Sequence, residues 1–303
     1  MSRRRNFAAA FSLLPVMAAG ELNVVVVEGL GGESRYAEQF AEQVAAIERS
    51  AQSLTSAGSI RVFRSGEFSR EEVIEHFAGL TQSMQSGDRL AIFLIGHGSY
   101  DDHEYKFNIA GPDLTDADLL DIVDGAAAVN VLLVNTSSAS GATLERLRSD
   151  ERTLILATRS GAERHATRFG TYFAAALTQP TADLDKNRVI SAEEAFRFAE
   201  RQVTDYFERN GQLATEHPRI EGSQAARFGL ARLGATRTAT SDAELDRLIM
   251  RRDALNTDIE ELRLRRDSMT ADAYQEELLD NMLELATLEE QIEQRQEALD
   301  RDN

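Results

Sequence analysis

Five short apolar runs, rich in valine, isoleucine and leucine, recur along the first half of the chain. They are Leu22–Val27, Ile60–Phe63, Leu90–Ile95, Val131–Val134 and Leu154–Ala157. Continuous apolar runs of this length are typical of strands buried on both faces of a parallel sheet. Helix-like stretches separate the runs, with capping-box signals at Ser69–Glu72 and Thr115–Asp118. This alternation predicts an α/β fold, an αβα sandwich with a mainly parallel sheet, over residues 20–235.

A different pattern occupies residues 236–303, where the chain has neither glycine nor proline. Apolar residues follow a heptad seam that Arg252 interrupts, and the seam resumes after a short break at which Thr270 can cap the second helix. The first part of the seam contains Leu245, Leu248, Leu255, Ile259 and Leu262, and the second contains Leu278, Met282, Leu285 and Ile292. This spacing predicts an α-helical hairpin with coiled-coil packing. The hairpin either packs on itself or on the domain, or it mediates homo-oligomerisation or partner binding.

The N-terminal residues 1–19 have the composition of a signal peptide. Three arginines, Arg3 to Arg5, precede the apolar run Phe7–Ala19, which ends in small residues. We therefore expect a periplasmic or secreted protein. An uncleaved signal acting as a membrane anchor is one alternative, and a buried first helix, disfavoured by Pro15, is another.

Charge and cysteine content exclude several classes of function. The chain has 303 residues, with 33 basic and 51 acidic side chains and a net charge of −18. We expect no nucleic-acid partner, because binding to phosphates depends on lysine and arginine. The apolar N-terminal run is too short for a stable membrane span. The absence of cysteine excludes disulfides, cysteine-bound zinc and a cysteine nucleophile.

Two of the predicted strands end in residues that could carry chemistry. The first runs into Gly96-His97-Gly98, and the second runs into Asn135-Thr136-Ser137-Ser138. Open α/β sheets bind ligands at the carboxyl ends of their strands, where these two ends could lie side by side.

This layout resembles the caspase–legumain superfamily of cysteine peptidases, and most closely its bacterial legumain-like members. Such proteins pair a His-Gly after one strand with a Cys-x-Ser-Gly after the next. His97-Gly98 matches the first motif, and Ser138-Ala139-Ser140-Gly141 matches the second with serine in place of cysteine. A second register places Ser137 at the nucleophile position. The resemblance implies a caspase-like fold and peptide-bond cleavage, with His97 as acid and base and the Gly98 amide as oxyanion donor.

Serine departs from this family pattern at its most critical position, because a hydroxyl ionises far less readily than a thiol. We favour a degenerate peptidase, or pseudopeptidase, that binds peptide or protein. One alternative is an active hydrolase that uses Ser138 or Ser137 with His97. Another is a scaffold protein that acts through its hairpin. None of the three requires a cofactor, and whether the chain is an enzyme stays open.

A further cluster has the spacing of a calcium-binding loop. Oxygen-bearing side chains stand at positions 1, 3, 5, 9 and 12 of such a loop, and they are Asp183, Asp185, Asn187, Ser191 and Glu194. Arg188 occupies the position that usually needs glycine, which places the sharp turn in doubt. The alternative, which we favour, is a turn followed by a Ser191–Glu194 capping box.

Overall fold

A six-stranded sheet forms the centre of the molecule. The computed structural model describes residues 20–126, 129–233, 242–266 and 269–302, so the predicted signal peptide lies outside the described residues. The strand order is β10-β8-β7-β3-β1-β2, and every neighbouring pair is parallel except β10 with β8. The strands are β1 (Leu22–Glu28), β2 (Ile60–Phe63), β3 (Arg89–Ile95), β7 (Asn130–Asn135), β8 (Arg152–Leu156) and β10 (Arg219–Glu221).

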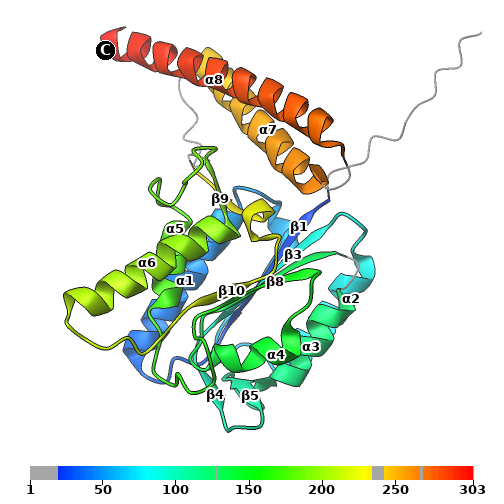
Figure 1. The fold of residues 1–303 in the computed structure, drawn as a ribbon, viewed down its shortest axis with the longest axis vertical. Coiled ribbons are helices and arrows are strands. Elements are labelled where there is room, and N and C mark those ends of the chain that lie inside the picture. The colour runs from blue at the N-terminus through cyan, green and yellow to red at the C-terminus, as the bar shows by residue number, and fades with distance from the viewer. Residues whose placement is uncertain (1–19, 127–128, 234–241, 267–268, 303) are drawn as a thin grey trace, which may run out of the picture.

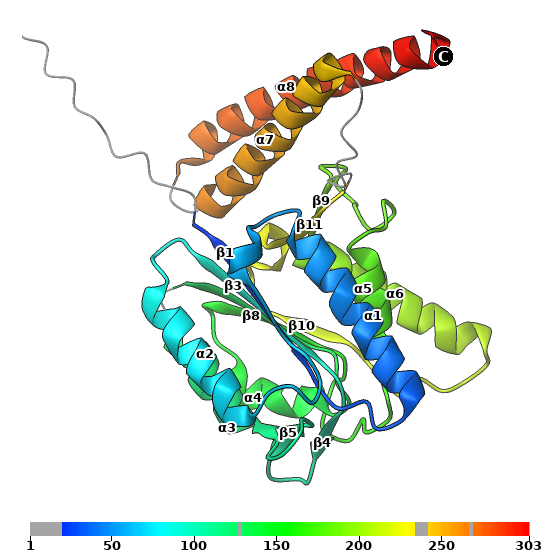
Figure 2. The same cartoon turned by 180° about the vertical axis from the view of Figure 1, so that it is seen from behind.

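Helices cover both faces of this sheet (Figures 1 and 2). One face carries α1 (Ser34–Ala51), α5 (Phe169–Ala176) and α6 (Ala192–Arg209), and the other carries α2 (Arg70–Ser83), α3 (Asp116–Gly125) and α4 (Leu144–Leu147). Alternate residues of one strand enter opposite cores, since Val24 and Val26 face the first layer while Val25 and Val27 face the second. The predicted αβα sandwich with a mainly parallel sheet is confirmed.

Local sequence signals determine where these helices begin. The capping boxes at Ser69–Glu72, Thr115–Asp118 and Ser191–Glu194 all form, at the starts of α2, α3 and α6. Each box satisfies backbone N–H groups that the first helical turn leaves without partners. No helix among the described residues is both long enough and apolar enough to cross a membrane.

Several short elements were not predicted. A three-stranded antiparallel sheet, β4 (Gly98–Tyr100), β5 (Tyr105–Phe107) and β6 (Leu114–Thr115), lies beyond the carboxyl end of β3. A two-stranded pair joins β9 (Val189–Ser191) to β11 (Gly229–Arg232). Short 3₁₀ turns occur at η1 (Ala57–Ser59), η2 (Ser140–Thr143) and η3 (Ala225–Arg227). Segments of two to four residues are too short to show a periodic pattern.

The C-terminal hairpin forms as predicted from α7 (Ala243–Arg265) and α8 (Ala271–Asp302). Its core contains Leu255, Ile259, Leu285 and Leu288, with Leu248 and Leu278 packed against it. The Thr270 hydroxyl accepts a hydrogen bond from the Ala273 amide at 3.3 Å. The boundary predicted between residues 235 and 236 falls within residues 234–241, outside the described residues.

One seam residue was assigned wrongly. Met282 is 38% exposed, and the buried position on α8 belongs to Leu288. The seam position at this turn belongs to Asn281. Because Asn281 is polar, the apolar pattern pointed instead to its apolar neighbour Met282.

The hairpin projects from the end of the domain at which β1 begins, whereas β4 and β5 lie at the opposite end (Figures 1 and 2). Two ion pairs connect it to the loop before β9. Arg263 on α7 contacts Asp185 at 2.5 Å, and Glu289 on α8 contacts Arg188 at 2.6 Å. The hairpin is therefore remote from the strand ends that carry His97 and Ser138.

Candidate functional site

The carboxyl ends of β3 and β7 bring the predicted site residues to one edge of the sheet. The two strands pair in parallel with Leu94 opposite Asn135, so His97 and Ser138 follow neighbouring strand ends. A hydrogen bond from the Thr136 amide to the Leu94 carbonyl, 3.0 Å long, extends the pairing to the last residues before the site. The juxtaposition expected from the sequence is therefore present.

His97 packs against α1 through its ring. Its imidazole meets Tyr36 and Phe40 edge-on, with ring centroids 4.8 and 5.0 Å apart. Burial lowers the pKa of His97 below its usual value of 6.5, and a hydrogen bond with the Gly31 backbone opposes this shift only in part. The imidazole is consequently neutral at neutral pH and contacts the loop after β1.

Ser138 forms a reciprocal contact with the backbone of Gly98. Its hydroxyl donates to the Gly98 carbonyl at 2.9 Å and accepts from the Gly98 amide at 3.4 Å. The residue is only 4% exposed. The Gly98 amide, which the family resemblance assigns to an oxyanion hole, therefore points at the hydroxyl itself.

Ser137 belongs to a closed, buried network with Tyr105 and Asn135. The Ser137 hydroxyl donates to the Asn135 side-chain oxygen at 2.8 Å and lies 2.6 Å from the Tyr105 hydroxyl. The Asn135 amide group donates to that same Tyr105 oxygen at 3.0 Å. Complete burial raises the pKa of Tyr105 to about 12, so the phenol stays protonated. Ser137 therefore serves as a structural link beneath the site.

These contacts separate the histidine from both serines. Across the described residues, no hydrogen bond joins the His97 imidazole to the hydroxyl of Ser137 or Ser138. A serine nucleophile requires a base within hydrogen-bonding reach of its hydroxyl. The arrangement shown is one of packed, mutually satisfied polar groups.

The loop after Ser138 is fixed by contacts with the segment that follows β8. Ala139 has a left-handed backbone with φ of 57°, and its amide donates to the Glu163 carbonyl at 2.8 Å. The Ser140 hydroxyl accepts from the Thr158 amide at 3.1 Å. These contacts fix the backbone of the loop, while the Ser138 hydroxyl itself is held by the Gly98 carbonyl.

Sequence reasoning missed four residues that shape this site. Tyr105 lies on β5, a strand too short to predict, and Tyr36 and Phe40 carry only an ordinary helical apolar pattern. Asn135 did give a usable signal, because a polar residue at the end of an apolar strand needs a buried partner.

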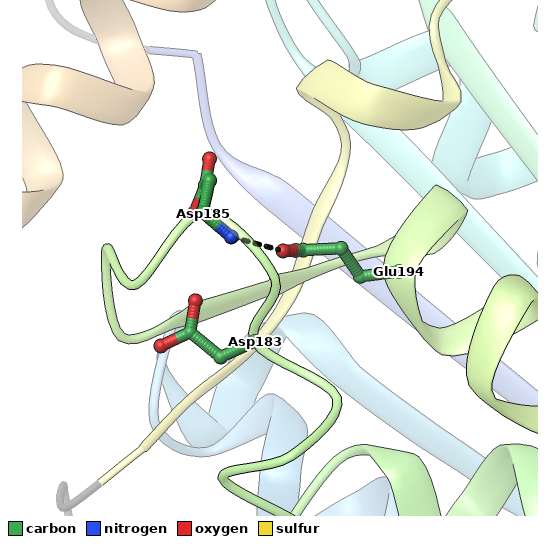
Figure 3. A group of neighbouring side chains, drawn as sticks. All are labelled: Asp183, Asp185 and Glu194. Carbon is green, nitrogen blue, oxygen red and sulfur yellow. Dashed lines mark hydrogen bonds between the residues drawn. The ribbon is translucent and has the colours of Figure 1, made fainter.

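The loop with calcium-binding spacing lies at the opposite end of the domain from His97, beside the hairpin. Carboxylate oxygens of Asp183, Asp185 and Glu194 lie within 4.8 Å of one another (Figure 3). Arg188 adopts a left-handed φ of 66°, so the sharp turn forms without glycine. The loop passes directly into β9 and then α6, whose N-cap is Ser191.

Backbone amides and one arginine already satisfy these carboxylates. Asp183 accepts hydrogen bonds from the amides of Asn187 and Arg188 at 3.1 and 3.0 Å. Glu194 accepts from the Leu184 amide at 2.8 Å, and Asp185 pairs with Arg263. Burial raises the pKa of Asp183, and the nearby Glu194 and Asp185 charges raise it further. The predicted turn with its capping box is present, and calcium binding stays a prediction.

Comparisons with known proteins show resemblance in structure. Neither a protein-family model nor a curated protein matches the chain. Protein GSU0716 from Geobacter sulfurreducens is similar at a TM-score of 0.46 and 13% identity, over 71% of this chain and 98% of that one. Caspase-1 from Spodoptera frugiperda is similar at a TM-score of 0.43 and 13% identity, over 74% of this chain and 92% of that one.

Proposed function

We propose that the α/β domain is a degenerate caspase–legumain-like peptidase domain that binds peptide or protein without cleaving it. The proposal joins the motifs His97-Gly98 and Ser138-Ala139-Ser140-Gly141 to the geometry of the two strand ends that carry them. The observation that carries it is the hydrogen bond of the Ser138 hydroxyl to the Gly98 carbonyl, with His97 bound elsewhere.

Hydroxyl chemistry supports an inactive site. A serine attacks a carbonyl only when a base removes its proton, and among the described residues no hydrogen bond joins His97 to either serine. The Ser138 hydroxyl instead donates a hydrogen bond to the Gly98 carbonyl, and Ser138 is almost fully buried. A hydroxyl held in this way disfavours the alternative of an active serine hydrolase on the same scaffold.

Ligand binding at this edge has support from its exposed surface. Leu30 is 40% exposed in the loop after β1, next to the Gly31 backbone that contacts His97. His97 itself is half-buried. An exposed leucine beside glycine-rich backbone offers an apolar contact and room for an extended peptide to approach.

Activity can be tested directly with a fluorophosphonate probe and a mixed peptide library. We expect no labelling of Ser138 and no cleaved peptide by mass spectrometry. Labelling of the unmodified protein that disappears in Ser138→Ala would establish a serine hydrolase and overturn the proposal.

Binding requires a separate measurement. Peptides selected on the immobilised full chain by phage display should lose affinity in Leu30→Asp and in His97→Ala. Leu184→Asp is the matched control, because Leu184 is 48% exposed in the loop before β9, at the end of the domain that contacts the hairpin. Equal affinity in all three variants would place the peptides elsewhere on the molecule and contradict binding beside His97.

A further inference from the structure

The outer face of α8 carries an apolar stripe that no described part of the chain covers. Leu279, Met282 and Leu283 are 60%, 38% and 59% exposed. Three of the six exposed large apolar side chains in the described residues thus lie within five positions of one helix. Ala286 continues the stripe and is also exposed. Clustering of this kind marks an interaction surface, whereas single exposed leucines are ordinary.

Helix geometry separates this stripe from the hairpin seam. Positions i, i+3, i+4 and i+7 share one side of a helix, and Leu279, Met282, Leu283 and Ala286 have this spacing. The residues that pack against α7, which include Leu285 and Leu288, lie on the other side. The hairpin projects from the domain, so one side of α8 is engaged and the other is open (Figures 1 and 2).

Acidic side chains flank the stripe at both ends. Asp272 and Glu276 precede it on the same side of the helix, and Glu290 and Glu293 follow it; all four are exposed. Within the described ranges, none of these four carboxylates forms an ion pair with an arginine or lysine. By contrast, Glu277, Glu284 and Glu289 pair with arginines of α7 or of the domain. The acidic flanks are therefore available to a partner.

The negative charge of α8 determines which kind of partner can bind to the apolar stripe. α8 contains eleven acidic and two basic residues, a net charge of −9. A second copy of this helix would bring two such charges together, and an anionic membrane would be repelled in the same way. We propose that the outer face of α8 binds a basic amphipathic helix of a partner protein. Its apolar residues would cover Leu279–Ala286, and its lysines or arginines would meet the acidic flanks.

The dimensions suit a single helix. The face from Asp272 to Glu293 spans about 30 Å at the usual rise of an α-helix. Three exposed apolar anchors at its centre are a small contact area, for which a micromolar dissociation constant is the expected order of magnitude, about 1–50 μM. Because four carboxylates contribute, the affinity should fall as salt screens them.

A designed peptide provides the probe for a test on the full chain. The peptide has about 20 residues, leucines at helical spacing in its centre and lysines at both ends. Two control peptides carry glutamate in place of lysine or the same residues in scrambled order. Fluorescence anisotropy should give micromolar binding of the basic peptide and at least about tenfold weaker binding of both controls.

Variants of the chain then locate the contact. Leu279→Ser with Leu283→Ser should weaken binding at least about tenfold, and Leu213→Ser, a control at another exposed leucine, should not. Glu276→Gln with Glu290→Gln keeps the apolar stripe and should flatten the salt dependence. All of these side chains are exposed, and circular dichroism verifies that each variant keeps its helix content.

Three results would overturn the proposal. They are the absence of binding at about 100 μM peptide, equal binding of the scrambled or acidic peptide, and unchanged affinity in the double leucine variant. A mass of the full chain that doubles with concentration, and that the double leucine variant abolishes, would assign the stripe to self-association instead. The peptidase-like site enters none of these measurements, so its proposed function stands or fails separately.

Discussion

Gly98 is the position at which the packing of the site can be tested most sharply. A Cβ atom added there would lie 2.6 Å from the Ser137 hydroxyl, 2.6 Å from the Ser138 carbonyl oxygen and 2.7 Å from the Tyr105 hydroxyl. Ser137 and Tyr105 are fully buried, and Ser138 O belongs to the backbone, so none of the three can move away cheaply. Gly98→Ala therefore pushes the segment after β3 away from Tyr105 and from the segment after β7, which the native contacts hold together.

Overpacking of a well-packed interior costs roughly 1–3 kcal/mol, and three simultaneous contacts place this variant near the upper end, about 3 kcal/mol. At about 2–4 °C per kcal/mol for a domain of this size, the melting temperature should fall by about 6–12 °C. Gly79→Ala is the matched control. Gly79 lies exposed in α2 with no atom within 4 Å of an added Cβ, so alanine should stabilise the helix by about 1 kcal/mol.

Urea unfolding followed by near-ultraviolet circular dichroism is the suitable assay, because five of the six tyrosines lie in the α/β domain. Far-ultraviolet signals would mix the domain with the hairpin. Opposite signs for the two glycine variants are expected. Equal or greater stability of Gly98→Ala would show that Gly98 does not pack against Ser137 and Tyr105, and the closed arrangement of the site would be wrong.

Further measurements address the buried network, the histidine and the acidic loop. Tyr105→Phe removes the buried acceptor of the Asn135 amide group and one partner of the Ser137 hydroxyl, which should cost about 1–3 kcal/mol in urea unfolding; a loss below about 0.5 kcal/mol would contradict the network. The His97 proton resonances should titrate with a pKa below 6.5, because the folded state disfavours the charged ring. Its contribution to stability should be complete above pH 6.5 and decline as the pH falls through the folded pKa, and a midpoint above 6.5 would refute the burial argument. If the loop binds calcium, millimolar calcium should raise the melting temperature by a few degrees, and Glu194→Gln should remove the shift while its neighbour Glu193→Gln keeps it. An unchanged melting curve of the wild-type chain would leave the loop as a capped turn.

The sequence predicted those features that depend on patterns longer than about one helical turn. The strands of the parallel core, the capping boxes and the two helices of the hairpin all follow from apolar spacing and cap residues. The same reasoning placed His97 and Ser138 at neighbouring strand ends, because parallel strands share one carboxyl edge.

Contacts between distant short segments could not be predicted in this way. Tyr105 is 32 positions from Ser137 in sequence, and no periodicity relates them. The orientation of His97 toward Tyr36 and Phe40 depends on how α1 crosses the sheet. Arg188 shows a different failure, since a rule based on residue type disfavoured a left-handed turn that the surrounding hydrogen bonds hold in place.

The hydrogen bond from Ser138 to the Gly98 carbonyl limits how this site could change in evolution. At 2.9 Å, the carbonyl oxygen requires a proton donor opposite it. A thiolate at position 138 would present lone pairs to that oxygen, and the repulsion would favour the neutral, unreactive thiol. A single substitution to cysteine would thus supply sulfur without a nucleophile, and a second change would be needed to turn the carbonyl away. The contact therefore couples the side chain at position 138 to the backbone at Gly98, so the two would have to change together.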